Sequence, residues 1–236
     1  MSRLANVIRW EVTLQYRYKF YAVTGFVVFF WVCVLSLFPG ISRTNSGLVV
    51  PAFFAINLNI TTFYFIAGLV LLERGEGIHT ALVTSPLRDF EYLISKVVTL
   101  TLLATLESIA IVVVVLGGGF QWTLLLAGSF QLAVIYSLIG FILVLPYDSI
   151  NAFLMPSVVY VTLLLLPLVE HFGGLSRVFF YLHPVEPALV LMRGAYISSS
   201  WGELAYGVVG GLLWMGICFL VARRRFEEFL VRRVAV

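Results

Sequence analysis

Residues 97–116 read VVTLTLLATLESIAIVVVVL, a run of 20 residues in which Glu107 is the one ionisable side chain. A helix needs about 20 mostly apolar residues to cross the hydrocarbon core of a bilayer. The run is continuous, whereas the strands of a membrane barrel alternate in polarity over about ten residues. Residues 97–116 therefore predict a transmembrane helix.

Five further runs have the same character, and none of them contains Asp, Glu, Lys or Arg. The six predicted spans are Phe20–Phe38, Leu48–Leu72, Val97–Leu116, Trp122–Leu145, Ile150–Val169 and Leu204–Ala222. Together they make up just over half of the chain. Because lipid offers the backbone no hydrogen-bond partners, continuous spans of this length must be helical. The predicted fold class is an all-α integral membrane protein with six transmembrane helices.

The composition argues against most soluble classes of protein. Hydrophobic residues make up 61% of the chain and charged residues 11%. Ordinary soluble domains are about 25% charged, and a soluble fold of this size needs such groups to cover its surface. We therefore expect neither a soluble enzyme nor a disordered chain, and no nucleic acid among the partners.

The basic residues are distributed unevenly between the predicted loops. Twelve of the 15 Lys and Arg lie in the amino-terminal segment, in the segment after the second span or in the carboxy-terminal tail. The other three are Arg43, Arg177 and Arg193. Since Lys and Arg concentrate on the cytoplasmic side, both termini are predicted to be cytoplasmic.

Residues 1–19 predict a short amphipathic helix before the first span. Four polar residues three or four apart form one stripe: Asn6, Arg9, Thr13 and Arg17. Apolar side chains surround the other side, although Glu11 and Gln15 interrupt that face. We interpret the segment as an interfacial helix in the cytoplasmic headgroup layer. The alternative is a basic flank that only sets the topology.

Residues 73–96, ERGEGIHTALVTSPLRDFEYLISK, form the one sizeable internal loop predicted on the cytoplasmic side. Gly75 and Gly77 break the end of the second span, and residues 78–83 can make a short helix. Ser85 suits a helix cap and Pro86 the first helical position. A loop that only connected two spans could be much shorter, so we predict a docking surface for another protein. A solvated connector is the alternative.

Residues 170–203 form a long external segment that is still rich in apolar residues. The run from Pro187 to Ile197 is too short to cross a bilayer, and it predicts a re-entrant or interfacial hairpin before the last span. An external gate is the functional interpretation, with these candidate residues: His183, Pro184, Pro187 and Arg193. The alternative is a hydrophobic lid packed on the helix ends.

Glu107 falls near the predicted bilayer midplane, where a carboxylate needs a partner, a proton or a water-filled cavity. Other polar residues fall at similar depth or line nearby stripes: Asn57, Asn59, Thr62 and Thr105. They predict a substrate or proton site. A contact between helices, with Glu107 protonated, is the alternative. The chain has neither a phosphate-loop motif nor a His-Glu-x-x-His zinc motif, so we expect no catalytic residue, metal or cofactor on it.

The order of these features resembles the membrane subunit of the ABC-2 family of ATP-driven exporters. The resemblance covers nearly the whole chain, which would be a single transmembrane domain over residues 1–236. The most specific match is Glu73-Arg74-Gly75-Glu76-Gly77, then Leu82-Val83-Thr84-Ser85-Pro86-Leu87, then Lys96, which is similar to the family's coupling loop. His79-Thr80 departs from the Thr-Leu-Glu that commonly follows the loop glycine. His183-Pro184, Pro187 and Arg193 are similar to the family's segment before the last span.

Within this family the chain looks most like drug-export permeases, including fluoroquinolone exporters, and haem-export permeases have a similar plan. The resemblance implies two membrane subunits, identical or not, and two ATPase subunits that carry ATP and Mg. It also implies an amphipathic solute at the subunit interface and a bacterial inner membrane. The implied ATPase contacts are Glu73, Gly77, Ile78, His79, Thr80, Leu82, Val83, Ser85 and Pro86. A non-transporting anchor that recruits a cytoplasmic partner through the same loop is the competing hypothesis.

Overall fold

The computed structural model describes residues 3–37, 45–78, 89–174 and 176–234. Within these residues every regular element is helical. The elements are α1 (Arg3–Arg17), α2 (Phe20–Leu37), α4 (Ser46–Leu58), η1 (Asn59–Tyr64), α5 (Phe65–Gly75), α7 (Asp89–Leu116), α8 (Trp122–Val144), α9 (Ile150–Leu164), α10 (Pro167–His171), η2 (Arg177–Phe180), α11 (Glu186–Gly194) and α12 (Trp201–Val234).

Six stretches of helix are long and apolar enough to cross a membrane, as the sequence predicts. They are Phe20–Leu37, Ser46–Gly75, Phe90–Val115, Trp122–Val144, Ile150–His171 and Trp201–Val231. The second combines α4, the π-helical turn η1 and α5. The third and sixth belong to helices that run well past the predicted spans, because polar residues near a helix end do not interrupt its backbone hydrogen bonds.

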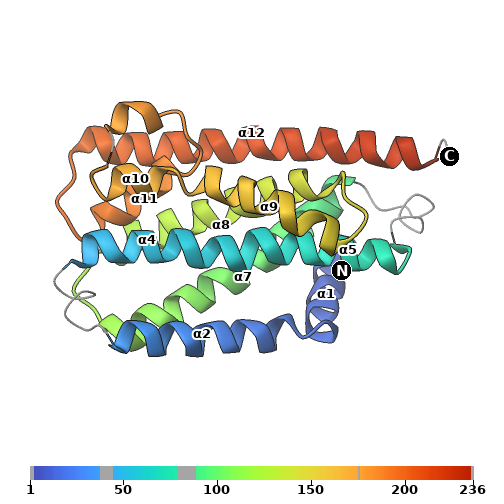
Figure 1. Ribbon diagram of the computed structural model, residues 1–236, viewed down its shortest axis with the longest axis horizontal. Helices are drawn as coiled ribbons and strands as arrows, with labels where there is room; N and C mark the ends of the chain where they lie inside the picture. The colour runs from blue at the N-terminus through green and yellow to red at the C-terminus, as the bar shows by residue number, and fades with distance from the viewer. Residues whose placement is uncertain (1–2, 38–44, 79–88, 175, 235–236) are drawn as a thin grey trace.

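The long helices lie side by side, with α12 along one edge of the bundle and α2 along the opposite edge (Figure 1). The carboxy terminus of α12, the whole of α1 and the end of α5 lie toward one end, which we call the terminal end (Figure 1). The elements α10, η2 and α11 lie at the far end. The two termini thus share one end, as six crossings require.

Helix α8 is the centre of the bundle and packs against α4, η1, α5, α7, α11 and α12. Two glycines allow its closest contacts. A Cβ at Gly140 would lie 2.8 Å from the backbone oxygen of Phe63, and one at Gly128 would lie 2.8 Å from that of Ala188. Small residues at such crossings let helix backbones approach closely, which is how membrane helices gain packing energy.

Helix α11 is the short apolar segment predicted before the last span. Its residues from Ala188 to Met192 are almost fully buried, and it packs between α8, α12 and α4. Pro187 stands in its first turn. The segment is therefore part of the bundle interior.

Helix α1 lies across the direction of the long helices (Figure 1) and packs against α7 and α2. Its predicted polar stripe is exposed, since Asn6, Arg9, Thr13 and Arg17 all lie on the outer side. Glu11 and Gln15, which interrupt the apolar face, are fully buried. The inner face of α1 thus makes polar contacts with the bundle as well as apolar ones.

Candidate functional site

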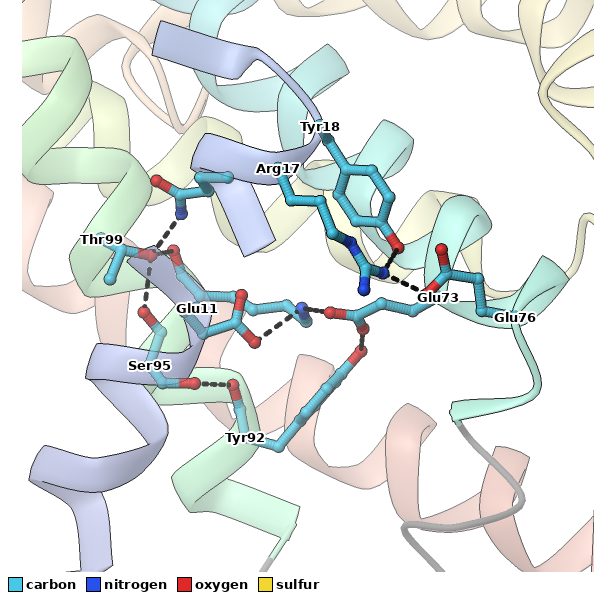
Figure 2. A network of polar contacts seen from close by, with 10 residues as sticks. Glu11, Arg17, Tyr18, Glu73, Glu76, Tyr92, Ser95 and Thr99 are labelled. Atoms are coloured by element: carbon cyan, nitrogen blue, oxygen red, sulfur yellow. Dashed lines mark hydrogen bonds and ion pairs between the residues drawn. The ribbon is translucent and has the colours of Figure 1, made fainter. Parts of the chain in front are cut away.

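The terminal end holds a buried ion network in which one ammonium group joins three helices. Lys96 of α7 donates from Nζ to Oε1 of Glu11 in α1, at 2.9 Å, and to Oε1 of Glu73 in α5. Figure 2 shows both carboxylates turned toward the same nitrogen. Lys96 is fully buried, and Glu11 and Glu73 are each 1% exposed. The first and last residues of the predicted docking loop, Glu73 and Lys96, are therefore tied directly to each other.

Further hydrogen bonds hold this network in place. Tyr92 of α7 donates from its hydroxyl to Oε2 of Glu73 at 2.5 Å. On the side of α1, Gln15 donates to the hydroxyl of Thr99 at 2.7 Å, and Thr99 donates to the backbone oxygen of Ser95 (Figure 2). We call Glu11, Glu73, Tyr92 and Lys96 the terminal-end network.

The network contains two carboxylates and one ammonium group, so the two carboxylates compete for the same ammonium. Glu73 accepts hydrogen bonds from both Lys96 and Tyr92, whereas Oε2 of Glu11 has no partner among the described residues. Burial raises the pKa of Glu11, Lys96 lowers it in part, and the charge of Glu73 raises it further. Glu11 therefore takes up a proton more readily than an exposed glutamate does.

A second, exposed ion pair lies outside the buried network. Arg17, at the end of α1, forms an ion pair with Glu76, just after α5, and also bonds the Tyr18 hydroxyl (Figure 2). The hydrogen bond from Tyr18 and the pairing with Arg17 lower the pKa of Glu76. This pair adds a solvated contact between α1 and the start of the loop.

Arg74 extends the connection from α5 to the turn between α8 and α9. Its guanidinium donates to the backbone oxygens of Leu145, at 2.9 Å, and Tyr147, and it pairs with Asp148 at 3.2 Å. The group also lies over the ring of Phe229 in α12, 4.7 Å from its centroid. Glu73 and Arg74 thus hold two different parts of the terminal end.

The predicted ATPase contacts lie partly within the described residues. Glu73 is buried in the network, so its carboxylate faces the interior. Gly77 ends α5 with φ of +72°, a conformation that favours glycine, and Ile78 is half-buried. The other predicted contacts lie outside the described residues: His79, Thr80, Leu82, Val83, Ser85 and Pro86.

The predicted mid-membrane residues of the second span and Glu107 are buried in the interior of this one chain. The mid-bundle cluster consists of Asn57, Asn59, Thr61, Thr62 and Glu107, each at most 3% exposed. The amides of Asn57 and Asn59 and the carboxylate of Glu107 have no close hydrogen-bond partner among the described residues. The Glu107 carboxylate faces Asn57 and Thr61 at a longer range.

The backbone around this cluster departs from the α-helix. Asn59–Tyr64 form a π-helical turn, and such turns occur frequently at functional sites. The hydroxyl of Thr62 donates to the backbone oxygen of Leu58 at 2.6 Å. Thr105, also predicted for this site, is half-buried and donates to the backbone oxygen of Thr101 within its own helix.

The predicted gate residues lie at the far end, around α11. Nδ1 of His183 accepts from the backbone nitrogen of Val185 at 3.2 Å, so Nε2 donates to the backbone oxygen of Leu163. Arg193 lies 3.7 Å from Glu170 of α10. Pro184 lies in the turn after His183, and Pro187 is buried at the start of α11. These residues join α11 to α9 and α10.

Sequence reasoning did not single out Glu11, Tyr92 or Lys96 as site residues. The sequence places Lys96 among the charges that set topology and in the motif that resembles the coupling loop. In the structure it lies within α7, in the part that precedes the predicted span. The sequence signal that could have revealed this network was Glu11, an acidic residue on the apolar face of the amphipathic helix predicted over residues 1–19. A buried carboxylate there requires a cation nearby, and Lys96 supplies it.

Comparison with known proteins places the whole chain in one family. Residues 2–234 match the family model described as the fluoroquinolones export permease protein family. The chain is 30% identical over 240 residues to proteins named fluoroquinolones export permease protein from two strains of Mycobacterium tuberculosis, with 100% of each chain covered. Together with the six apolar helices, these matches show that the chain belongs to the fluoroquinolones export permease family.

Proposed function

We propose that this export permease is the membrane subunit of an ATP-driven exporter, and that a separate ATPase drives it through residues 73–96. The observation that carries the proposal is the double contact of Lys96 with Glu73 and Glu11. Family membership supports the export function, and the resemblance to ABC-2 subunits supports the ATPase. The terminal end would then face the cytoplasm.

The terminal-end network suits the transmission of force from the loop. Glu73 is the first residue of the loop and Lys96 its last, and Glu11 belongs to the helix that leads into α2. Buried charge pairs with well-made hydrogen bonds hold their elements in one geometry, because separating them would leave a charge unpaired in the interior. A push on the loop would therefore move α1, α5 and α7 together.

The proposed working unit has two membrane subunits and two ATPase subunits, with ATP and Mg on the latter. Helices α2, α9 and α12 expose large apolar surfaces, which suit contact with lipid or with a second membrane subunit. The proposed solute is amphipathic and aromatic, of the fluoroquinolone class for which the M. tuberculosis relatives are named. The family match favours this solute over haem.

We also propose that the mid-bundle cluster contributes to the solute path. Asn57 and Glu107 face the interior of a single bundle. To reach a solute between two subunits, η1 and α7 would have to move apart. The irregular backbone of η1 and the amides without a close hydrogen-bond partner among the described residues support this role.

Transport in inside-out vesicles tests the proposal. Vesicles that contain the permease and its ATPase should accumulate norfloxacin, followed by its own fluorescence, when ATP is added. Val83→Asp, in the predicted docking helix, should abolish both ATPase binding and accumulation, whereas Glu227→Gln on the exposed side of α12 should change neither. ATPase binding without ATP-dependent accumulation would instead support the non-transporting anchor.

A further inference from the structure

A hollow at the terminal end opens between α8, α9 and α12, apart from both polar clusters. Its volume is about 310 Å³. Most of its wall is apolar or aromatic, and two charged side chains of α12 also line it. The residues that line it include Ile142, Leu143, Tyr160, Arg225, Glu228 and Phe229.

The aromatic walls of the hollow are held by contacts from outside it. The Arg74 guanidinium lies over the Phe229 ring, and Arg74 also holds the turn after α8 through the backbone oxygens of Leu145 and Tyr147. The hydroxyl of Tyr160 shares a hydrogen bond of 2.8 Å with that of Tyr147. Because these walls are fixed in advance, a ligand would not have to order them.

The charged residues form a loose pair. Arg225 and Glu228 lie 3.7 Å apart, with side chains that are 63% and 57% exposed. Exposed pairs of this kind contribute little to stability, so little is lost when they separate. Once separated, Arg225 could turn toward a carboxylate and Glu228 toward an ammonium group at the other end of the same ligand, since both side chains are exposed.

The size and chemistry of the hollow select one class of ligand. Small-molecule sites have volumes of about 300–1,000 Å³ and combine apolar walls with a few polar groups. At about 310 Å³ the hollow suits a flat bicyclic aromatic body and is too small to enclose the two acyl chains of a phospholipid. Tyr160 and Phe229 offer aromatic faces for such a body.

We propose that this hollow is the site at which a zwitterionic aromatic solute of the fluoroquinolone class first binds, from the cytoplasmic side. The inference rests on the proposed function for the choice of solute and for the side of the membrane. It adds a loading site on the single subunit, distinct from any path between subunits. Arg74 and its neighbour Glu73 place this site next to the terminal-end network, so an occupied site adjoins the region on which the ATPase acts.

Direct binding to the permease alone tests the site without transport. The permease, in lipid nanodiscs and without ATPase, is titrated with norfloxacin by fluorescence anisotropy. The double variant Arg225→Gln/Glu228→Gln should bind about tenfold more weakly, which corresponds to about 1.4 kcal/mol for the two exposed charged contacts together. The matched control is Arg223→Gln/Glu227→Gln, which removes an ion pair of 2.8 Å from the same helix outside the hollow and should bind like the wild type.

A second variant separates loss of the site from loss of the fold. Phe229→Leu keeps an apolar side chain but removes the ring, and it should weaken binding several-fold without lowering the thermal unfolding midpoint by much. Equal binding by the wild type and the Arg225→Gln/Glu228→Gln variant would overturn the proposal. So would a wild type that exports norfloxacin with ATP but does not bind it in nanodiscs, a result that would leave the proposed function standing. A wild type that binds norfloxacin in the hollow but never accumulates it would overturn the proposed function alone.

Discussion

The terminal-end network and the mid-bundle cluster both consist of buried polar groups inside the same helical bundle. They differ in the hydrogen-bond and ion-pair partners of their charged side chains. In the first, Lys96 lies within hydrogen-bond distance of Glu11 and Glu73, and Tyr92 adds a donor. In the second, the Glu107 carboxylate and two amides lack a close partner among the described residues. Among the described residues, the carboxylates of the first region each bond an ammonium group, whereas the carboxylate of the second faces only neutral side chains.

This difference distinguishes a rigid connection between helices from a region whose contacts can change. A buried pair with its hydrogen bonds made is costly to break, so the terminal end should keep its geometry through a transport cycle. A buried carboxylate without a close partner raises the free energy of the folded state. That free energy falls when a proton, water or a solute cation reaches the carboxylate. We therefore propose that the first region transmits force and that the second responds to the solute.

Removal of Lys96 should have the largest effect on stability. Lys96→Met leaves Glu11 and Glu73 buried without a cation, which should cost about 3–5 kcal/mol in the free energy of unfolding. Thermal unfolding of the purified permease in detergent measures the loss. Adding Glu11→Gln and Glu73→Gln to Lys96→Met should restore much of the stability, because the buried charges go together. An unchanged unfolding midpoint for Lys96→Met alone would show that the network does not hold the helices.

Glu107→Gln should separate function from stability. The neutral amide removes the cost of the buried carboxylate, so the free energy of unfolding should stay the same or rise by about 1 kcal/mol. ATP-dependent accumulation of cationic solutes should fall, while that of uncharged ones should not. Vesicle assays with a matched pair of such solutes provide the measurement, and unchanged transport of every cationic solute would remove Glu107 from the path.

Glu11 should give the terminal end a dependence on pH. Its pKa is raised above the ordinary 4.5, so the folded state binds the proton more tightly than the unfolded state. Its contribution to stability is complete below about pH 4.5 and is lost as the pH rises through the raised pKa. Glu11→Gln should flatten this part of the curve of unfolding midpoint against pH. Identical slopes for the two proteins would contradict the assignment.

His183 should give a smaller effect of the opposite sign at the far end. Burial lowers its pKa below the ordinary 6.5, and Nδ1 must stay unprotonated to accept from Val185. Its contribution to stability is therefore complete above about pH 6.5 and is lost as the pH falls through the lowered pKa. His183→Gln should remove this acid-side slope in the same unfolding measurements. A wild type whose midpoint stays constant through this range would contradict the contact.

The spans could be predicted from the sequence because length and apolar character are local properties. The six candidate spans, such as Trp122–Val144, follow from these two properties alone. The bond between Lys96 and Glu11 could not, since it joins residues 85 positions apart and depends on how α1 turns back against α7. The depth of Glu107 in the bilayer could be predicted from its place in a span. Its neighbours Asn57 and Thr61 could not, because they depend on how the helices are rotated about their axes. The close approach of α8 to Phe63 at Gly140 is another result of tertiary packing.

The proposed function requires the segment between α5 and α7 to face the cytoplasm, where an ATPase can reach it. A cysteine introduced by Thr80→Cys, with Cys33 and Cys218 replaced by Ala, can be labelled with a membrane-impermeant maleimide. Labelling should occur in inside-out vesicles and not in intact cells. Labelling in intact cells would place the segment outside and contradict the proposed mechanism.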